Sequence, residues 1–228
     1  KMDYKLWLNK KRTSFFFGNE FFDAIPIKQY SNLNNNFFEK CYIVKNNVII
    51  NETFIRGNKK DIAEIKSFKT LKKLNFLEYP KKGFLELNPI MKKINKLSGG
   101  ILLIDYGYLK SNNLSTLQAV MKNKKISMQD LFNNLGKADI TSLVNFNLLK
   151  EYFEQNKLKV KKIVFQKFFL ERMGIIERAK ILEKKMTIKQ RKYMSETLSR
   201  LLEEKHMGSL FKVIFGYNCK NNDFFGFD

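Results

Sequence analysis

Two apolar runs that each end in polar residues and glycine constrain the fold of this chain most strongly. They are FFFGNE at residues 15–20 and ILLIDYG at residues 101–107. Continuous apolar strands are typical of parallel sheets that are covered on both faces. The sequence therefore predicts an α/β fold in which two buried parallel strands bring polar side chains to the same edge of a sheet.

Between these two runs, residues 25–75 are predicted to form an inserted β/α unit. Asn-rich turns at residues 34–36 and 46–47 separate short strands, which favours an antiparallel arrangement. The expected elements are strands Ile25–Tyr30, Phe37–Val44 and Val48–Glu52, and a helix Asp61–Leu74.

The remainder of the chain alternates between strand and helix signals. FLELN at residues 84–88 is predicted as a strand, with Pro89 at the start of a helix that ends at Gly99. Residues 108–205 are expected to be mainly helical. The further expected elements are helices Asn145–Asn156, Phe168–Lys185 and Thr187–Lys205, an outer strand Leu158–Phe165 and a final strand Leu210–Tyr217.

Composition excludes several functional classes. The formal charge of +21 invites a nucleic-acid interpretation, but the excess is scattered lysine in a chain also rich in Asn, Ile and Phe, and arginine clusters are missing. We therefore expect no nucleic acid, and no membrane insertion, because no apolar run approaches the ~20 residues that a membrane helix needs. Cys41, Cys219 and the single His206 have no metal-site spacing, so no metal is expected.

The polar residues at the ends of the two apolar runs are the candidate site. Asn19, Glu20 and Asp23 follow the first run, and Asp105 and Tyr106 follow the second. Carboxylates that converge in one cleft can orient a polar substrate and accept its proton. The alternative is that Asn19 and Asp23 only cap a helix, although capping does not account for Glu20.

These residues also carry a resemblance. The blocks GNEFFDAIPIKQY, GGILLIDYGY, STLQAV, GKADITSLVNF and MGSLFKV, in this order, resemble the later part of the MidA-like family of S-adenosylmethionine-dependent methyltransferases. That family includes a mitochondrial factor that methylates an arginine on a subunit of respiratory complex I. The resemblance implies a Rossmann-like class I methyltransferase sheet from its fourth strand onward, with S-adenosylmethionine as cofactor and a protein as substrate.

The resemblance also implies roles for individual residues. Asn19 and Glu20 would lie beside the methyl donor, and Asp23 would begin the next helix. Glu20, Asp23 and Asp105 are the candidate catalytic residues, with Glu20 the first choice to anchor the acceptor guanidinium and Asp105 or Asp139 the second. The resemblance also implies that residues 108–205 form the substrate side. The implied substrate-binding residues are Tyr106, Asp139, Thr141 and Gln166.

One feature of such enzymes is absent, since no G-x-G occurs in these 228 residues. Glycine gives the donor-binding loop its close backbone approach. We therefore expect the chain to be the carboxyl-terminal portion of a longer protein, with an exposed apolar sheet edge. The alternative function is a non-catalytic assembly module, and a homodimer is left open. The expected location is the bacterial cytoplasm, or the mitochondrial matrix if the source is eukaryotic.

Overall fold

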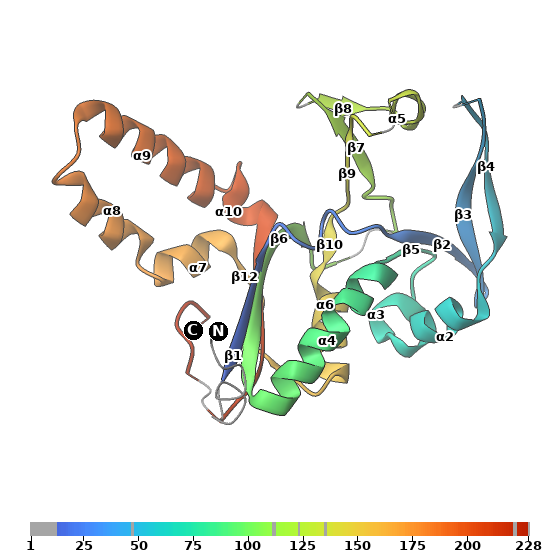
Figure 1. Ribbon diagram of the computed structural model, residues 1–228, viewed down its shortest axis with the longest axis horizontal. Helices are drawn as coiled ribbons and strands as arrows, with labels where there is room; N and C mark the ends of the chain where they lie inside the picture. The colour runs from blue at the N-terminus through green and yellow to red at the C-terminus, as the bar shows by residue number, and fades with distance from the viewer. Residues whose placement is uncertain are drawn as a thin grey trace, which may run out of the picture.

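The computed structural model describes residues 13–46, 48–110, 113–122, 124–134, 136–220 and 223–227. Its central sheet has the strand order β1-β6-β13-β11 (Figure 1). The strands β1 and β6 run parallel, with Phe16 beside Ile101, and β13 is antiparallel to β6. The predicted pair of parallel apolar strands is therefore confirmed. The strands are β1 (Ser14–Asn19), β6 (Gly99–Tyr108), β13 (Phe211–Asn218) and β11 (Lys159–Val160).

Two short strands extend this sheet. The strand β12 (Val164–Phe165) pairs antiparallel with β13, and β10 (Val144–Asn145) pairs parallel with β6. The predicted outer strand Leu158–Phe165 is thus two short pairings, β11 and β12, on the same neighbour. The intervening residues 161–163 do not belong to either strand.

A separate antiparallel sheet has the order β4-β3-β2-β5. The structure confirms the antiparallel arrangement predicted for this region, and it adds β5, which the sequence analysis missed. Lys28 pairs with Tyr79 at the β2–β5 contact, so the sheet returns to the point where α4 begins. Its strands are β2 (Lys28–Leu33), β3 (Asn36–Lys45), β4 (Val48–Arg56) and β5 (Phe76–Tyr79).

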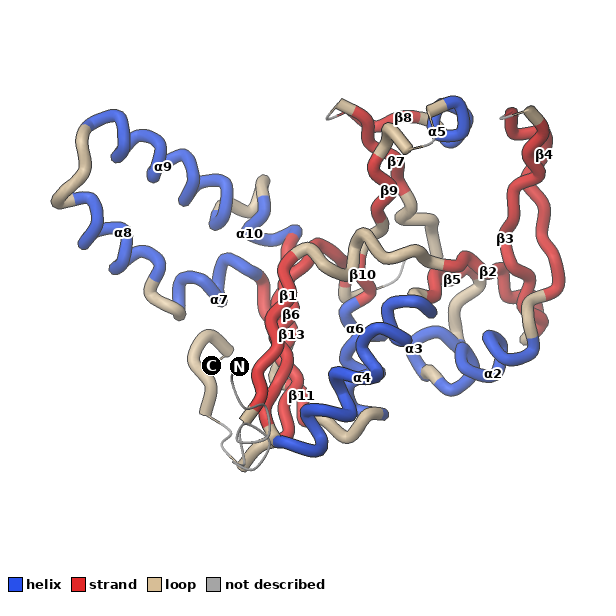
Figure 2. Tube along the Cα trace, in the orientation of Figure 1, coloured by secondary structure: helices blue, strands red, loops and turns tan. Residues whose placement is uncertain are grey.

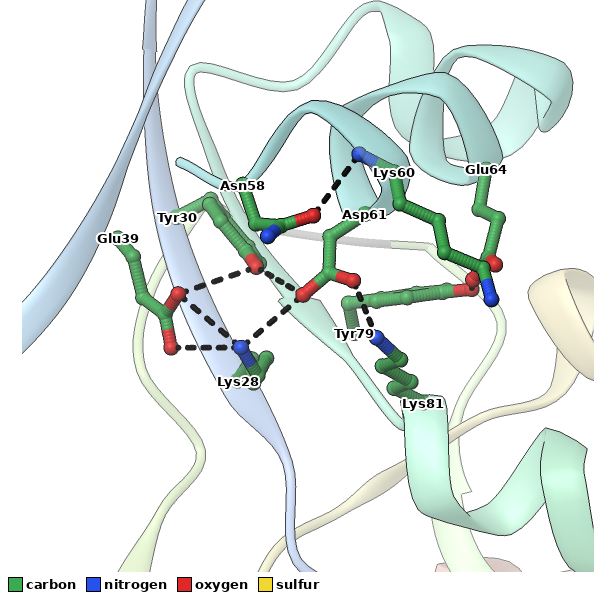
Figure 3. A network of polar contacts seen from close by, with 9 residues as sticks. All are labelled: Lys28, Tyr30, Glu39, Asn58, Lys60, Asp61, Glu64, Tyr79 and Lys81. Carbon is green, nitrogen blue, oxygen red and sulfur yellow. Dashed lines mark hydrogen bonds and ion pairs between the residues drawn. The ribbon is translucent and has the colours of Figure 1, made fainter. Parts of the chain in front are cut away.

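The antiparallel sheet carries a buried polar network around Asp61, whose side chain is almost completely buried (Figure 3). The Asp61 carboxylate forms ion pairs with Lys81 and with Lys28, the latter at 3.0 Å, and it accepts a hydrogen bond from the Tyr30 hydroxyl at 3.0 Å. Lys28 also pairs with Glu39 at 3.1 Å. This buried carboxylate is therefore neutralised from two sides.

Helices α2 (Lys59–Ser67) and α3 (Lys69–Lys72) replace the single helix predicted over residues 61–74. Phe68 has an extended backbone between them, with φ −92° and ψ 117°, and its side chain is buried. The break therefore lets an apolar side chain reach the core, where it contacts the ring of Phe84 at 5.4 Å between centroids.

The predicted strand at residues 84–88 is wrong, because helix α4 (Lys81–Leu97) runs through it with Pro89 inside. Phe84, Leu87, Met91 and Ile94 are all buried, and their spacing follows the helical period. Proline removes one backbone donor and leaves the carbonyl four residues earlier without its partner. That residue, Leu85, is 60% exposed, so water can satisfy the carbonyl.

One face of the central sheet is covered by α4 and by α6 (Phe146–Gln155) (Figure 2). As predicted, Asn145 caps α6, and its side chain accepts a hydrogen bond from the Leu148 N–H. The rings of Phe84 and Tyr152 stack at 4.2 Å between the two helices. This layer fixes the face of β6 from which Asp105 projects, because Ile101 and Leu103 on that face belong to the same core.

The opposite face of the sheet receives α7 (Gln166–Arg172), whose Phe169 packs with Val213 and Phe215. The single helix predicted over Phe168–Lys185 is instead two helices, because α7 ends at Arg172 and Gly174, with φ 79°, precedes α8. Beyond it, α8 and α9 form a pair of helices that extends away from the sheet (Figure 2). These helices are α8 (Ile175–Glu183) and α9 (Ile188–Leu202), and α10 (Met207–Leu210) returns the chain to β13.

A third, small sheet has the order β8-β7-β9. Both this sheet and the β3–β4 hairpin extend to the top of the molecule in Figure 1. The ring of Phe132 contacts Tyr42 at 6.0 Å between centroids, which joins α5 to that hairpin. Residues 108–205 therefore contain a sheet as well as helices. The elements are β7 (Gln118–Met121), β8 (Lys124–Ile126), β9 (Asp139–Thr141) and α5 (Met128–Asn133).

Strand β1 forms one edge of the central sheet, and among the described residues no strand pairs with its outer side. Its side chains Phe15 and Phe17 are 61% and 69% exposed. The exposed apolar sheet edge expected from the sequence is therefore confirmed. Within the described residues, no helix combines the length and the apolar composition needed to cross a membrane.

Candidate active site

Asp105 is held at the centre of the candidate site by three backbone N–H groups. Its Oδ2 atom accepts hydrogen bonds from Phe22 N at 2.8 Å and from Asp23 N at 3.3 Å, and its Oδ1 atom accepts one from Tyr106 N at 2.9 Å. The side chain is 2% exposed. The turn after β1 is thus tied to the carboxyl end of β6, and the two predicted groups of polar residues converge.

Asp23 is the second carboxylate of this centre, and it is also buried. The Tyr106 hydroxyl donates a hydrogen bond to its Oδ2 atom. The Oδ1 atom is buried and has no hydrogen-bond partner among the described residues. Because a buried polar atom without a partner costs roughly 1 to 3 kcal/mol, this oxygen is suited to receive a donor from a ligand.

The electrostatics of this centre differ from those of an ordinary surface carboxylate. Burial, followed by the charge of Asp23, raises the pKa of Asp105 to about 7, although its three N–H partners oppose the shift. Burial and the bond to Asp23 also raise the pKa of Tyr106. In the described part of the chain, neither carboxylate forms an ion pair.

The turn after β1 corrects two expectations. Residues 20–27 contain no helix, so Asp23 neither caps nor begins one. Instead, Glu20 has a left-handed backbone with φ 49°, and its N–H donates to the carbonyl of Ile104 at 3.0 Å. Asn19 and Glu20 are exposed, and the Asn19 amide donates to Glu20 Oε1 at 3.3 Å. They form a polar surface next to the buried carboxylates.

The third sheet is attached to this centre through β9. Ser142 N donates to the backbone carbonyl of Asp23 at 3.0 Å, and the Thr141 side chain bonds to Tyr106. Gln118 Nε2 in turn donates to Thr141 Oγ1 at 3.2 Å. Thr141 therefore contacts the site, whereas Asp139 is exposed at the other end of β9.

The structure does not bring Gln166 to the carboxylates. Its buried side chain donates from Nε2 to the carbonyl of Leu201 at 3.1 Å, which joins the start of α7 to the end of α9. Its preceding strand β12 is separated from β6 by β13. A structural position between helices accounts for this glutamine.

Gly107 forms a close crossing beside Asp105. It pairs with Val144 on β10, and a Cβ atom at this glycine would lie 2.0 Å from the Val144 carbonyl oxygen. Only glycine allows this approach. The crossing positions the 142–145 segment, whose Ser142 reaches Asp23.

Sequence reasoning missed a third buried carboxylate, Glu78 on β5. Its Oε1 atom accepts from Gln29 Nε2 at 2.8 Å and from Thr116 N at 2.9 Å, and its Oε2 atom accepts from the Thr116 hydroxyl at 2.6 Å. It lines a cavity of about 20 Å³ together with Phe22 and Ser142. The short apolar run of Phe76, Leu77 and Tyr79 around it was the available signal, but β5 itself was not predicted.

Comparisons with known proteins identify the family of the chain. A family model described as "Putative S-adenosyl-L-methionine-dependent methyltransferase" matches residues 3–164, which is more than half of the chain. The chain belongs to this family. The resemblance to MidA-like methyltransferases is therefore confirmed, and this methyltransferase family is one that depends on S-adenosylmethionine.

Relatives of this chain include proteins named as protein arginine methyltransferases. The mitochondrial protein arginine methyltransferase NDUFAF7 of Xenopus tropicalis is 24% identical over 200 residues, covering 87% of this chain and 45% of the relative. Its mitochondrial homolog in Caenorhabditis elegans is 27% identical over 216 residues, covering 87% and 46%. The chain therefore spans a little under half the length of the relatives it matches.

Two solved structures from Burkholderia thailandensis share the fold. A COG1565 superfamily member bound to S-adenosyl-homocysteine has a TM-score of 0.70 at 17% identity, covering 95% of this chain and 55% of that one. A native structure from the same superfamily has a TM-score of 0.72 at 18% identity, covering 97% and 57%. The chain thus has the α/β fold of these proteins.

Proposed function

We propose that the protein to which this chain belongs transfers a methyl group from S-adenosylmethionine to an arginine nitrogen of a protein substrate. Membership of the family and the names of the arginine methyltransferase relatives support the reaction class. The resemblance noted in the sequence extends the proposal to a respiratory complex I subunit as acceptor. The location would then be the mitochondrial matrix in a eukaryote and the cytoplasm in a bacterium.

The observation that carries the proposal is the buried pair Asp23 and Asp105. An arginine stays protonated at any cellular pH, so a site that methylates it needs carboxylates to orient its guanidinium. Asp23 Oδ1 is buried without a partner, and neither carboxylate has a cation from the described residues. A guanidinium from a substrate would supply both the missing donor and the missing positive charge.

Proton transfer fits the same pair. Asp105 has a pKa of about 7, so it exchanges a proton readily near neutral pH. Methylation of a guanidinium nitrogen releases one proton as the product forms, and Asp105 can accept it while Asp23, held by Tyr106, keeps the guanidinium in place. Glu20 lies at the exposed surface beside this pair and remains the candidate that contacts both the donor and the acceptor.

The donor site is supported by the residues at the end of β1. S-adenosylmethionine, when bound, supplies a sulfonium-activated methyl group. Asn19 and Glu20 are exposed and polar at the carboxyl end of a parallel strand, which is where α/β sheets bind such ligands. The left-handed backbone of Glu20 directs the chain sharply away from the strand, so these residues fit the role of holding the donor.

We propose further that the chain is one part of a longer methyltransferase. The strand order β1-β6-β13-β11, with β13 antiparallel, suits the later half of a class I sheet, and β1 exposes its outer edge. The chain also spans 45% to 46% of its curated relatives. Additional strands with the donor-binding glycine loop would pair with β1.

The test is a calorimetric titration with S-adenosylmethionine of the 228-residue chain and of a version extended upstream in its gene. We expect binding by the extended protein, and Glu20→Gln should weaken it, whereas Glu177→Gln on α8 serves as the matched control. Methyl transfer to an arginine peptide should be lost in Asp23→Asn. Failure of the extended protein to bind the donor would contradict the proposal and favour a non-catalytic assembly module.

A further inference from the structure

A second cavity lies beside the candidate active site, near the sheet edge formed by β12 and β13. It has a volume of about 410 Å³, which is in the range of ligand pockets. Its walls come from the β11–β12 turn, from α7 and from the start of β13. We call it the Lys212 pocket, and it is lined by Leu109, Lys162, Ile163, Val164, Phe165, Phe168, Arg172, Lys212 and Phe227.

The charges of the Lys212 pocket all have one sign. Its ionisable lining residues are Lys162, Arg172 and Lys212, and no carboxylate lines it. None of the three forms an ion pair within the described ranges of the chain. In contrast, Lys28 and Lys81 on the antiparallel sheet both pair with a carboxylate. The pocket is therefore a locally electropositive cavity.

Lys212 is the buried member of this set, with 8% of its surface exposed. Its Nζ atom donates to the carbonyls of Ser209 and Leu210, each at 3.0 Å, and lies 5.2 Å from the centroid of the Phe165 ring. Burial lowers its pKa. Neutral carbonyls do not balance an ammonium charge, so an anion in the pocket would improve the electrostatics of the folded chain.

The register of the sheet places the pocket close to the proposed acceptor site. Asp105 on β6 pairs with Lys212 on β13, and Lys212 pairs with Phe165 on β12. Neighbouring strands lie about 4.8 Å apart, so Phe165 is roughly 10 Å from Asp105 across the sheet. An extended polypeptide advances about 3.3 Å per residue and spans this distance in about three residues.

We propose that the Lys212 pocket binds an acidic side chain of the protein substrate, about three residues from the arginine that is methylated. This rests on the proposed function, which supplies the protein substrate. The three cations recognise the carboxylate, and the Phe165 and Phe168 rings pack against its methylene groups. A basic chain with a formal charge of +21 thereby gains a specific, rather than a diffuse, attraction for an acidic partner.

The test compares two short peptides that differ in two side-chain charges. Each has a central arginine, with glutamate on both sides at the third position in one peptide and glutamine in the other. Binding to the 228-residue chain is measured by calorimetry without a methyl donor. We expect the glutamate peptide to bind about tenfold more tightly, because one buried charge-assisted contact contributes about that factor.

Variants separate the pocket from general charge attraction. The double variant Lys162→Gln, Arg172→Gln should remove the difference between the peptides, and both residues are exposed, so the fold should survive. Lys180→Gln, Lys189→Gln on α8 and α9 removes the same charge and should retain the difference. Lys212→Met, with its fold checked by circular dichroism, should also abolish it. A difference that persists in the first double variant contradicts the proposal.

A free anion is the other source of the same chemistry. Titration with inorganic phosphate tests this source. If phosphate binds to the wild type but not to the variant Lys162→Gln, Arg172→Gln, and the two peptides bind equally, the proposal of a substrate subsite is wrong. The outcome is distinct from failure of the proposed function, since peptide binding is measured without donor. Loss of methyl transfer alone would leave the difference between the two peptides intact.

Discussion

The two buried aspartates Asp61 and Asp105 have opposite surroundings, although each accepts several hydrogen bonds. Asp61 is paired with Lys28 and Lys81 (Figure 3). Burial alone would raise the pKa of Asp61, but its bonds to these lysines outweigh burial, and the pKa is lowered. Asp105 receives only backbone N–H groups, lies beside Asp23, and has its pKa raised to about 7. A carboxylate whose charge the protein balances stabilises the fold, whereas one left without a cation is available for a ligand.

The largest expected effect distinguishes the two by stability. Asp61→Asn removes the carboxylate partner of Lys81 and one of the two partners of Lys28, so we expect the free energy of unfolding to fall by about 2 to 4 kcal/mol. Asp105→Asn weakens the bonds from the backbone N–H groups, but it also removes a buried charge that no cation balances. Because these two effects oppose each other, we expect the free energy of unfolding to change by at most about 1 kcal/mol. Urea denaturation at pH 8 measures both. Equal losses would contradict the comparison.

The pH dependence of stability sharpens the comparison. The pKa of Asp105 is raised in the folded state. Its contribution to the free energy of unfolding is therefore complete below the pKa of the unfolded chain, near 4, and is lost as the pH rises to about 7. The pKa of Asp61 is lowered in the folded state, so its contribution to the free energy of unfolding is present above pH ~4 and stays constant between pH 5 and 7. Between pH 5 and 7 the wild type should lose up to about 1.4 kcal/mol per pH unit.

The control for this experiment is Asp105→Asn, measured by urea denaturation across the same pH values. Its free energy of unfolding should be nearly independent of pH between 5 and 7, because the group that titrates there is absent. A variant with the same slope as the wild type would show that another group is responsible.

The smallest expected effects on stability concern the two tyrosines. Tyr30 donates to Asp61 and Tyr106 donates to Asp23, so Tyr30→Phe and Tyr106→Phe should each cost about 1 kcal/mol. Only Tyr106→Phe should slow methyl transfer by the extended protein, by about tenfold or more, since it loosens the proposed guanidinium-binding carboxylate. Initial rates of methyl transfer to an arginine peptide measure this. An equal loss of rate in Tyr30→Phe would show that the loss comes from lower stability and not from the proposed site.

The sequence was sufficient for the elements whose local pattern agrees with their packing. The parallel apolar strands β1 and β6, the capped helix α6 and the strand β13 were all predicted. FLELN was instead predicted as a strand, and the alternation of Leu85 and Leu87 with Glu86 and Asn88 also fits a strand. The helical spacing from Phe84 to Ile94 decides the structure, and an exposed Pro89 is tolerated on the solvent side of α4.

The candidate site was predicted in part for a similar reason. Asp23, Asp105 and Tyr106 follow apolar strands, so their convergence can be inferred from two local signals. The short β5 and the buried carboxylates Glu78 and Asp61 depend on partners 30 to 50 positions away, such as Gln29 at a separation of 49 and Tyr30 at 31. No local pattern encodes such pairs, so they become apparent only in the folded chain.

The close crossing at Gly107 has a consequence for how this gene can change over time. Glycine is scarce here, with 11 residues among 228, in a composition rich in lysine, asparagine and phenylalanine. Codons of glycine begin with two guanines, so a mutational drift toward adenine and thymine acts against them. The crossing at Val144 leaves no room for a replacement, and purifying selection should therefore preserve this codon while the exposed surface drifts.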